Sequence, residues 1–103
     1  MNYRYTVKAT FQSADVAQEW VLWLKSGHCE DVLKSGAAQV ELVALDSEDK
    51  AFEVRYIFVS REAFLDYEEK HAVRLRREGL ELFPVQRGIS YFRSTGALLF
   101  ESP

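Results

Sequence analysis

Apolar and polar residues alternate along four stretches of the chain, and a period of two is typical of β-strands that bury one face. The alternation predicts strands over residues 3–11, 38–45, 52–58 and 86–95. The apolar residues 97–100 either extend the last strand or form a fifth one. Each strand therefore has one face that must pack against another part of the protein.

A polar turn over residues 46–50 joins the second and third strands and predicts a β-hairpin. In the register that this turn favours, Leu42 faces Val54 on the apolar side and Glu41 faces Arg55 on the polar side. Such cross-strand pairs contribute roughly a few tenths of a kcal/mol, so they fix the register more than the stability.

Apolar residues at helical spacing occupy the segments between the strands. The spacing predicts a helix between Ser13 and Gly27, a short helix over residues 28–35, and the longest helix between Ser60 and Gly79. Both serines are suitable N-caps, and both glycines are typical helix stops.

The order of elements is therefore β-α-(α)-β-β-α-β. This order predicts an α+β fold of the ferredoxin-like type, with an extra short helix after the first helix. We expect an antiparallel four-stranded sheet with the helices on one face. A chain of 103 residues has the size of one domain, so residues 1–103 are expected to form a single domain.

Two helices can cover only one face of such a sheet, so the other face is open. The apolar alternation assigns to the covered face Tyr5, Val7, Val40, Leu42, Val54, Tyr56 and Phe58. The open face then carries Arg4, Thr6, Lys8, Gln39, Glu41, Val43, Glu53, Arg55 and Ile57. The last strand adds Arg87, Ile89, Tyr91 and Arg93 to one face. The pattern does not decide which face receives them, and we count Ile89 and Tyr91 with the open one.

An open face with apolar residues among charges is either solvated or paired with a second copy of the chain. We favour pairing, because the apolar residues 97–100 would otherwise be an aggregation liability. Two such sheets facing each other enclose a cavity. The expected assembly is therefore a homodimer through the open sheet face.

Charge and composition exclude several functions. The chain has 13 Lys and Arg against 16 Asp and Glu, so its net charge of -3 disfavours binding to nucleic acid through a basic surface. No apolar run approaches the roughly 20 residues that span a bilayer, so no membrane insertion is expected. The chain has one cysteine, Cys29, and no apolar leader at its start. These features predict a cytoplasmic protein.

Several motifs together resemble a family of small bacterial proteins known only as a domain of unknown function. In the first half they are residues 19–24 (EWVLWL), His28, residues 31–33 (DVL) and Gly36. In the second half they are Tyr67, His71, Ala72, Leu75, Arg76, residues 78–80 (EGL), Phe83, Pro84, Phe92 and Arg93. The resemblance covers nearly the whole chain.

That family is similar to the dimeric α/β-barrel superfamily of ferredoxin-like domains. The superfamily includes antibiotic monooxygenases and EthD-like proteins, and it holds both enzymes and plain ligand binders. The resemblance therefore implies a barrel-type dimer without assigning a reaction. The aromatic helix followed by His28 is similar to the corresponding region of EthD-like proteins, and His28 is the one residue that the resemblance carries over.

Two histidines are candidates for chemistry. His28 follows a helix-ending glycine, so it either caps a helix or faces a cavity mouth. In the second position it could act as a general base, because its ordinary pKa is about 6.5. His71 lies in the apolar stripe of the longest helix. It is either a core histidine with one hydrogen bond or an acid or base that works with His28.

Other residues also have two interpretations. Trp20 and Trp23 either pack in the core or line an aromatic pocket, with one of them at its border. Cys29 is either a small buried thiol or a nucleophile at a helix start. We expect no metal and no cofactor, because no set of three ligands is apparent. A basic run in the longest helix is either a solvated helix end or an anion site: Arg74, Arg76 and Arg77.

Three functions remain. The first is a homodimeric small-molecule-binding domain. Its ligand would lie between the sheet and the helices or in the cavity between the two subunits, near Trp20, Trp23, His28, His71 and Tyr91. The second is a cofactor-independent enzyme of the monooxygenase or isomerase type that uses His28 and Tyr91. The third is a protein-interaction module that binds a partner through Leu22 and the sheet face. We favour binding over catalysis.

Overall fold

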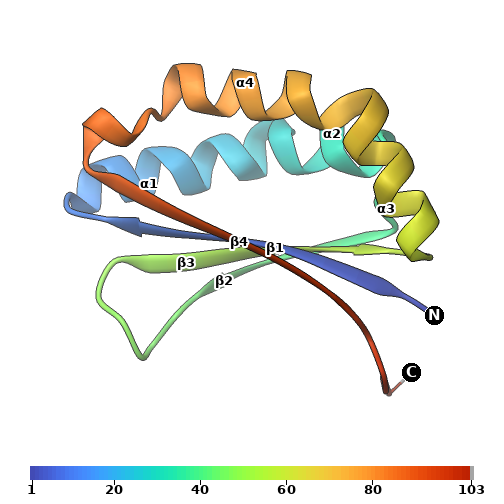
Figure 1. Cartoon of the computed structure of the whole chain (residues 1–103). Helices are drawn as coiled ribbons and strands as arrows, with labels where there is room; N and C mark the ends of the chain where they lie inside the picture. Colours follow the sequence, from blue (N-terminus) through green and yellow to red (C-terminus); the bar gives the residue numbers. More distant parts are fainter. Residues whose placement is uncertain (103) are drawn as a thin grey trace.

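The computed structural model describes residues 1–102 and contains one four-stranded antiparallel sheet with the helices on one face (Figure 1). The α+β ferredoxin-like fold expected from the sequence is confirmed, including the extra short helix. The elements are β1 (Tyr3–Phe11), α1 (Ala14–Trp23), η1 (Leu24–His28), α2 (Cys29–Lys34), β2 (Gln39–Ala44), β3 (Ala51–Phe58), α3 (Arg61–Tyr67), η2 (Glu68–Ala72), α4 (Val73–Leu82), η3 (Val85–Arg87) and β4 (Ile89–Ala97).

The strand order is β2-β3-β1-β4, so β1 lies between β3 and β4. The predicted hairpin register is confirmed: Leu42 faces Val54 and Glu41 faces Arg55. The Arg55 guanidinium donates to Glu41 Oε1 at 3.1 Å and to Glu53 Oε1 at 2.7 Å. This charged group holds the edge strand β2 in register on the open face of the sheet.

The sequence predicts a helix stop at Gly27, and the first crossover is interrupted there. Gly27 has non-helical backbone angles, so two helical segments meet at a kink. The turn η1 is π-helical, and the Cys29 amide closes it by donating to the Leu24 carbonyl. The predicted short helix α2 therefore begins directly after η1, at Cys29.

The prediction that the longest helix ends at Gly79 is wrong, because α4 continues to Leu82. A Cβ atom at Gly79 would lie 3.2 Å from Cη2 of Trp23. The glycine therefore serves a close approach between α4 and the indole of α1. No helix among residues 1–102 is long and apolar enough to cross a membrane.

The last strand begins at Ile89, three residues later than the alternation predicts. Residues Val85–Arg87 form a 3-10 turn, and Gly88 follows with a φ of 81°, which favours glycine. After Ala97 the Leu98 amide still donates to the Asn2 carbonyl at 2.9 Å. Residues 98–102 add no fifth strand.

The placement of Ile89 and Tyr91 on the open face is wrong. In the register of β1 and β4, Ile89 pairs with Phe11, Tyr91 with Ala9, and Arg93 with Val7, so all three lie on the helix side. Phe92 takes the open face instead and is 67 % exposed.

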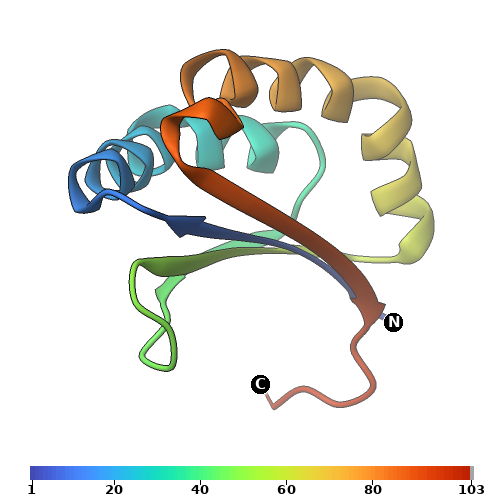
Figure 2. The same cartoon turned by 60° about the vertical axis from the view of Figure 1, so that its left-hand side comes forward.

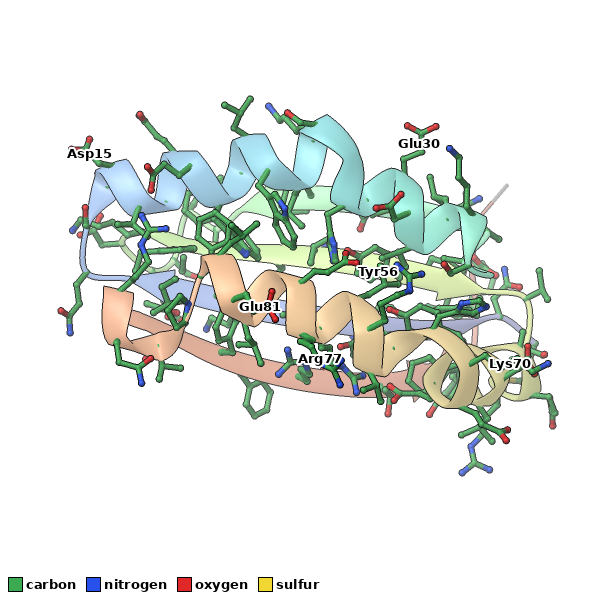
Figure 3. All side chains as sticks on the ribbon, turned by 90° about the horizontal axis from the view of Figure 1, so that it is seen from above. Asp15, Glu30, Tyr56, Lys70, Arg77 and Glu81 are labelled. Atoms are coloured by element: carbon green, nitrogen blue, oxygen red, sulfur yellow. The ribbon has the colours of Figure 1, made fainter. Side chains whose placement is uncertain are left out.

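The core lies between the sheet and two helical rows, α1–α2 and α3–α4 (Figure 2). Seen from above, the rows lie side by side and Tyr56 lies between them (Figure 3). Phe58 is fully buried, and its ring contacts Phe64 and Tyr67 at centroid distances of 5.3 and 5.2 Å. The covered face is therefore the one that the alternation predicts.

Candidate functional site

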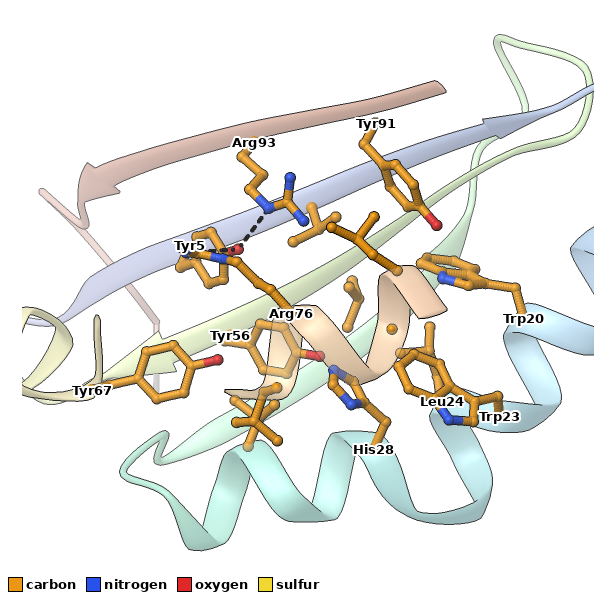
Figure 4. Close-up of a pocket in the computed structure, with 16 residues that line it drawn as sticks. Tyr5, Trp20, Trp23, Leu24, His28, Tyr56, Tyr67, Arg76, Tyr91 and Arg93 are labelled. Carbon is orange, nitrogen blue, oxygen red and sulfur yellow. Dashed lines mark hydrogen bonds between the residues drawn. The ribbon is translucent and has the colours of Figure 1, made fainter. Parts of the chain in front are cut away.

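A cavity opens between the sheet and the two helical rows (Figure 4). Its volume is about 60 Å³, and sixteen residues from three strands and both rows line it. Four of the five residues predicted at a ligand site are among them: Trp20, Trp23, His28 and Tyr91. The fifth, His71, is not.

Both tryptophans of the chain form the wall on the α1 side. Trp20 is 3 % exposed and packs on Phe11 and Phe52, so most of its ring belongs to the core. Trp23 is only partly buried and lies at the border of the cavity. The sequence suggests either core packing or a place at the border of a pocket for these residues. Trp20 takes the first position and Trp23 takes the second.

His28 ends η1, directly after the kink at Gly27, and its ring stacks on Trp23 at a centroid distance of 4.1 Å. Its Nδ1 atom is buried and has no hydrogen-bond partner in the protein. Burial lowers the pKa of His28, and the negative charges of Asp31 and Glu78 offset this effect only in part. The imidazole is therefore neutral at pH 7.

His28 also lines a second, more open hollow, together with Trp23, Asp31 and Glu78. The imidazole thus separates the inner cavity from an acidic outer surface. A neutral ring in this position can accept a proton from a ligand in the cavity, with solvent close by on its other side.

His71 lies apart from this arrangement. It is half-buried on η2, and its nearest aromatic neighbour is Tyr67, at a centroid distance of 6.5 Å. The structure therefore does not bring His28 and His71 together at the cavity, and it gives no support to an acid–base pair of these two residues.

The polar centre of the cavity is a cluster of Tyr5, Arg76 and Arg93, which no local sequence pattern joins. The Tyr5 hydroxyl accepts a hydrogen bond from Arg76 Nη2 at 3.2 Å and one from Arg93 Nε at 3.1 Å. Arg76 also forms an ion pair with Glu68. Figure 4 shows the two guanidinium groups reaching Tyr5 from α4 and β4.

The remaining tyrosines of the wall stay protonated. Burial raises the pKa values of Tyr56, Tyr67 and Tyr91, that of Tyr67 to about 12. Tyr91 already donates its proton to the Phe83 carbonyl at 2.7 Å. Its hydroxyl can therefore accept a hydrogen bond from a ligand more readily than it can donate one.

Cys29 is a partly buried thiol. Burial raises the pKa of its Sγ group, and contact with the Tyr56 hydroxyl offsets this only in part. The residue is not among those that line the cavity. Within residues 1–102, no three His, Cys, Asp or Glu side chains gather closely enough to hold a metal ion.

Comparison with known families now identifies the chain. The model of a family described as "Domain of unknown function (DUF4286)" matches residues 3–95. This chain belongs to the DUF4286 family. The resemblance noted from the sequence motifs is thereby confirmed. No curated protein matches the chain.

Solved structures share the fold of this DUF4286 chain. A dimeric ferredoxin-like protein from an uncultured marine organism matches with a TM-score of 0.74 and 11% identity, over 98% of each chain. SnoaB, a cofactor-independent oxygenase from Streptomyces nogalater, matches with a TM-score of 0.72 and 10% identity, over 99% of this chain and 97% of its own. A candidate antibiotic biosynthesis monooxygenase from Deinococcus radiodurans matches with a TM-score of 0.68 and 11% identity, over 100% and 97%. At this identity the likeness shows the fold alone.

The lowered pKa of His28 gives a testable pH dependence. The unfolded chain takes up a proton at His28 near pH 6.5, whereas the folded chain resists it, so the free energy of unfolding falls as the pH falls below 6.5. We expect an NMR titration midpoint for His28 below 6.5, with His71→Gln used to assign the two imidazole signals. His28→Gln should reduce the loss of stability between pH 7 and pH 5. A midpoint at or above 6.5 would contradict the burial argument.

Proposed function

We propose that this DUF4286 chain is a homodimeric domain, residues 1–103, that binds a small molecule in the cavity between its sheet and its helices. The observation that carries the proposal is a pair of buried polar atoms on residues that line the cavity. His28 Nδ1 and Arg76 Nε both lack a hydrogen-bond partner in the protein. Such an atom costs about 1–3 kcal/mol when left unpaired, so it favours a bound partner.

The size of the cavity limits the ligand. A cavity of about 150 Å³ accommodates benzene in a protein core. The present cavity has about 60 Å³, so even a single ring requires side chains of the wall to move. Leu80 can do so, because it is exposed. The ligand is therefore a small molecule with no more than about one ring.

A catalytic role is the second candidate, favoured by the neutral imidazole of His28 at the cavity wall. There His28 would take a proton from the bound ligand. The two candidates differ in one respect: a binder releases its ligand unchanged, whereas an enzyme releases a product.

The cytoplasmic location expected from the sequence stays a prediction.

Binding can be tested with a library of small fragments and isotope-labelled protein. We expect some fragments to shift the indole NMR signals of both Trp20 and Trp23, because both rings line the cavity. Gly79→Ala should weaken the binding of these fragments by about tenfold. The added Cβ would press on Trp23, and overpacking costs about 1–3 kcal/mol.

Gly96→Ala is the matched control, because a Cβ there meets nothing within 4 Å. Fragments that bind equally well to both glycine variants, or that shift only signals away from the indoles, would contradict the proposed site. Mass analysis of recovered fragments separates binding from turnover, and His28→Gln should abolish any turnover while leaving the fold intact.

The proposed interface is the open sheet face. Phe92 is 67 % exposed there on β4, and the half-buried Ile57 and Val43 lie on the same face of the sheet, on β3 and β2. The tail residues Leu99 and Phe100 are 85 % and 89 % exposed and would also be covered by a partner copy. The dimeric state of the marine ferredoxin-like protein supports this assembly.

Native mass spectrometry tests the interface. We expect a mass of twice 11.9 kDa for the natural chain and a monomer for Phe92→Glu, because a buried carboxylate without a partner is costly. Leu22→Glu is the control, since Leu22 is 64 % exposed on α1 in the helix layer. A natural monomer, or a dimer lost only in Leu22→Glu, would move the interface away from the sheet and favour an interaction module.

A further inference from the structure

The cavity is positively charged although the chain as a whole is acidic. Its sixteen lining residues include Arg76, Arg93 and His28 and not one Asp or Glu. The whole chain, in contrast, has 16 acidic against 13 basic residues. An anion that enters the cavity therefore meets no carboxylate on its wall.

The two arginines differ in their charge balance. Burial disfavours the charge on Arg76, but the ion pair with Glu68 raises the pKa of Arg76 above its ordinary value. The carboxylate of Glu68 also balances the positive charge of Arg76. Arg93 forms no ion pair with a carboxylate of residues 1–102. Its Nε donates to Tyr5, and its guanidinium lies 5.7 Å from the ring centre of Tyr91. The cavity thus has one uncompensated positive charge, at Arg93.

The Tyr5 hydroxyl adds a hydrogen-bond donor at the same place. A phenol oxygen has two acceptor sites and one proton. Hydrogen bonds from Arg76 and Arg93 fill both acceptor sites, so the proton is the part that is left to bond with a ligand. Two cationic donors on one oxygen also polarise its O–H group and strengthen the bond that it donates.

We propose that the cavity binds a small aromatic carboxylate, whose oxygens accept hydrogen bonds from the Arg93 guanidinium and the Tyr5 hydroxyl. This inference rests on the proposed function and specifies its ligand class. The ring of the ligand lies against Trp23 and Tyr91, which are the partly buried aromatic walls. A guanidinium binds a planar carboxylate through two parallel hydrogen bonds, which fixes the orientation of the ligand.

A carboxylate fits better than a phosphate. One uncompensated cation balances a monoanion, whereas a phosphate group carries close to two charges at neutral pH. The apolar part of the wall, which includes Leu24, Val54 and Leu75, makes the desolvation of a second charge costly. Both anions suit an arginine, so the experiment compares them directly.

Titration calorimetry with sodium benzoate, benzamide and inorganic phosphate at constant ionic strength tests the proposal. Benzamide has the ring and planar shape of benzoate without its charge. We expect benzoate to bind at least about tenfold more tightly than benzamide, because a hydrogen bond to a charged group is worth about 1.5–3 kcal/mol. Phosphate should bind more weakly than benzoate.

Arg93→Gln should reduce benzoate binding to the level of benzamide and leave benzamide binding unchanged. Arg93 is exposed, so this variant should fold normally. Arg77→Gln is the matched control, because Arg77 is an exposed arginine of α4 that does not line the cavity. Tyr5→Phe should weaken benzoate binding to a smaller extent, and its folding is checked by its NMR spectrum.

Each other outcome overturns the carboxylate assignment. Equal affinity for benzoate and benzamide would show that the site does not select a charged ligand, although it would remain a small-molecule site. The same conclusion would follow if neutral fragments bound the cavity and benzoate did not. Tighter binding of phosphate would assign a phosphorylated ligand. An equal loss in Arg77→Gln and Arg93→Gln would show surface attraction alone. Failure of every fragment to reach the indoles would overturn the proposed function as well.

Discussion

The hydroxyl of Tyr5 is the point on which the arrangement of the cavity depends. Tyr5 lies on β1 in the middle of the sheet, is 4 % exposed, and accepts hydrogen bonds from arginines of α4 and β4. A buried hydroxyl without partners would cost about 1–3 kcal/mol, so the burial of Tyr5 requires at least one of these bonds. They also draw two cationic side chains to one spot beneath the helices. The same interaction thus satisfies the core and gives the cavity its charge.

The other wall depends on how closely α4 approaches α1. Gly79 lets the helix contact the Trp23 indole, and that indole in turn stacks on His28. His28 can reach this position because η1 adds a π-helical turn and the chain kinks at Gly27 before α2 begins. Small features of the backbone therefore place an aromatic pair and a neutral imidazole opposite the cluster of Tyr5, Arg76 and Arg93. The cavity is built from residues that are far apart along the chain and belong to eight different elements.

The fold could be predicted from local patterns, because each pattern arises from an interaction between residues that are close together along the chain or from burial of one face of an element. Alternation in β1, β2 and β3 follows from burial of one face, and the pairing of Glu41 with Arg55 follows from the length of the hairpin turn. The helix caps Ser13 and Ser60 were also recognisable, since each accepts a backbone N–H three residues ahead. Such features need no knowledge of the rest of the chain.

The candidate site could be predicted only in part. The alternation of β4 shows that Tyr91 and Arg93 share a face, but only pairing with β1 decides which one. Arg93 and Tyr5 are 88 residues apart, and no local pattern joins them. Gly79 has the sequence signature of a helix stop, although its role is a tertiary contact with Trp23. The place of His71 in an apolar stripe indicates burial, but it does not reveal that the residue lies apart from the cavity.

The most direct test of the central claim is a crystal structure of the natural chain soaked with a brominated benzoate. Anomalous scattering from bromine locates the ring without reference to the rest of the density. We expect a single bromine position in the cavity between Trp23 and Tyr91, with the carboxylate within hydrogen-bond distance of Arg93 and Tyr5. Bromine found only outside the cavity, or inside it with the carboxylate turned away from both residues, would contradict the account.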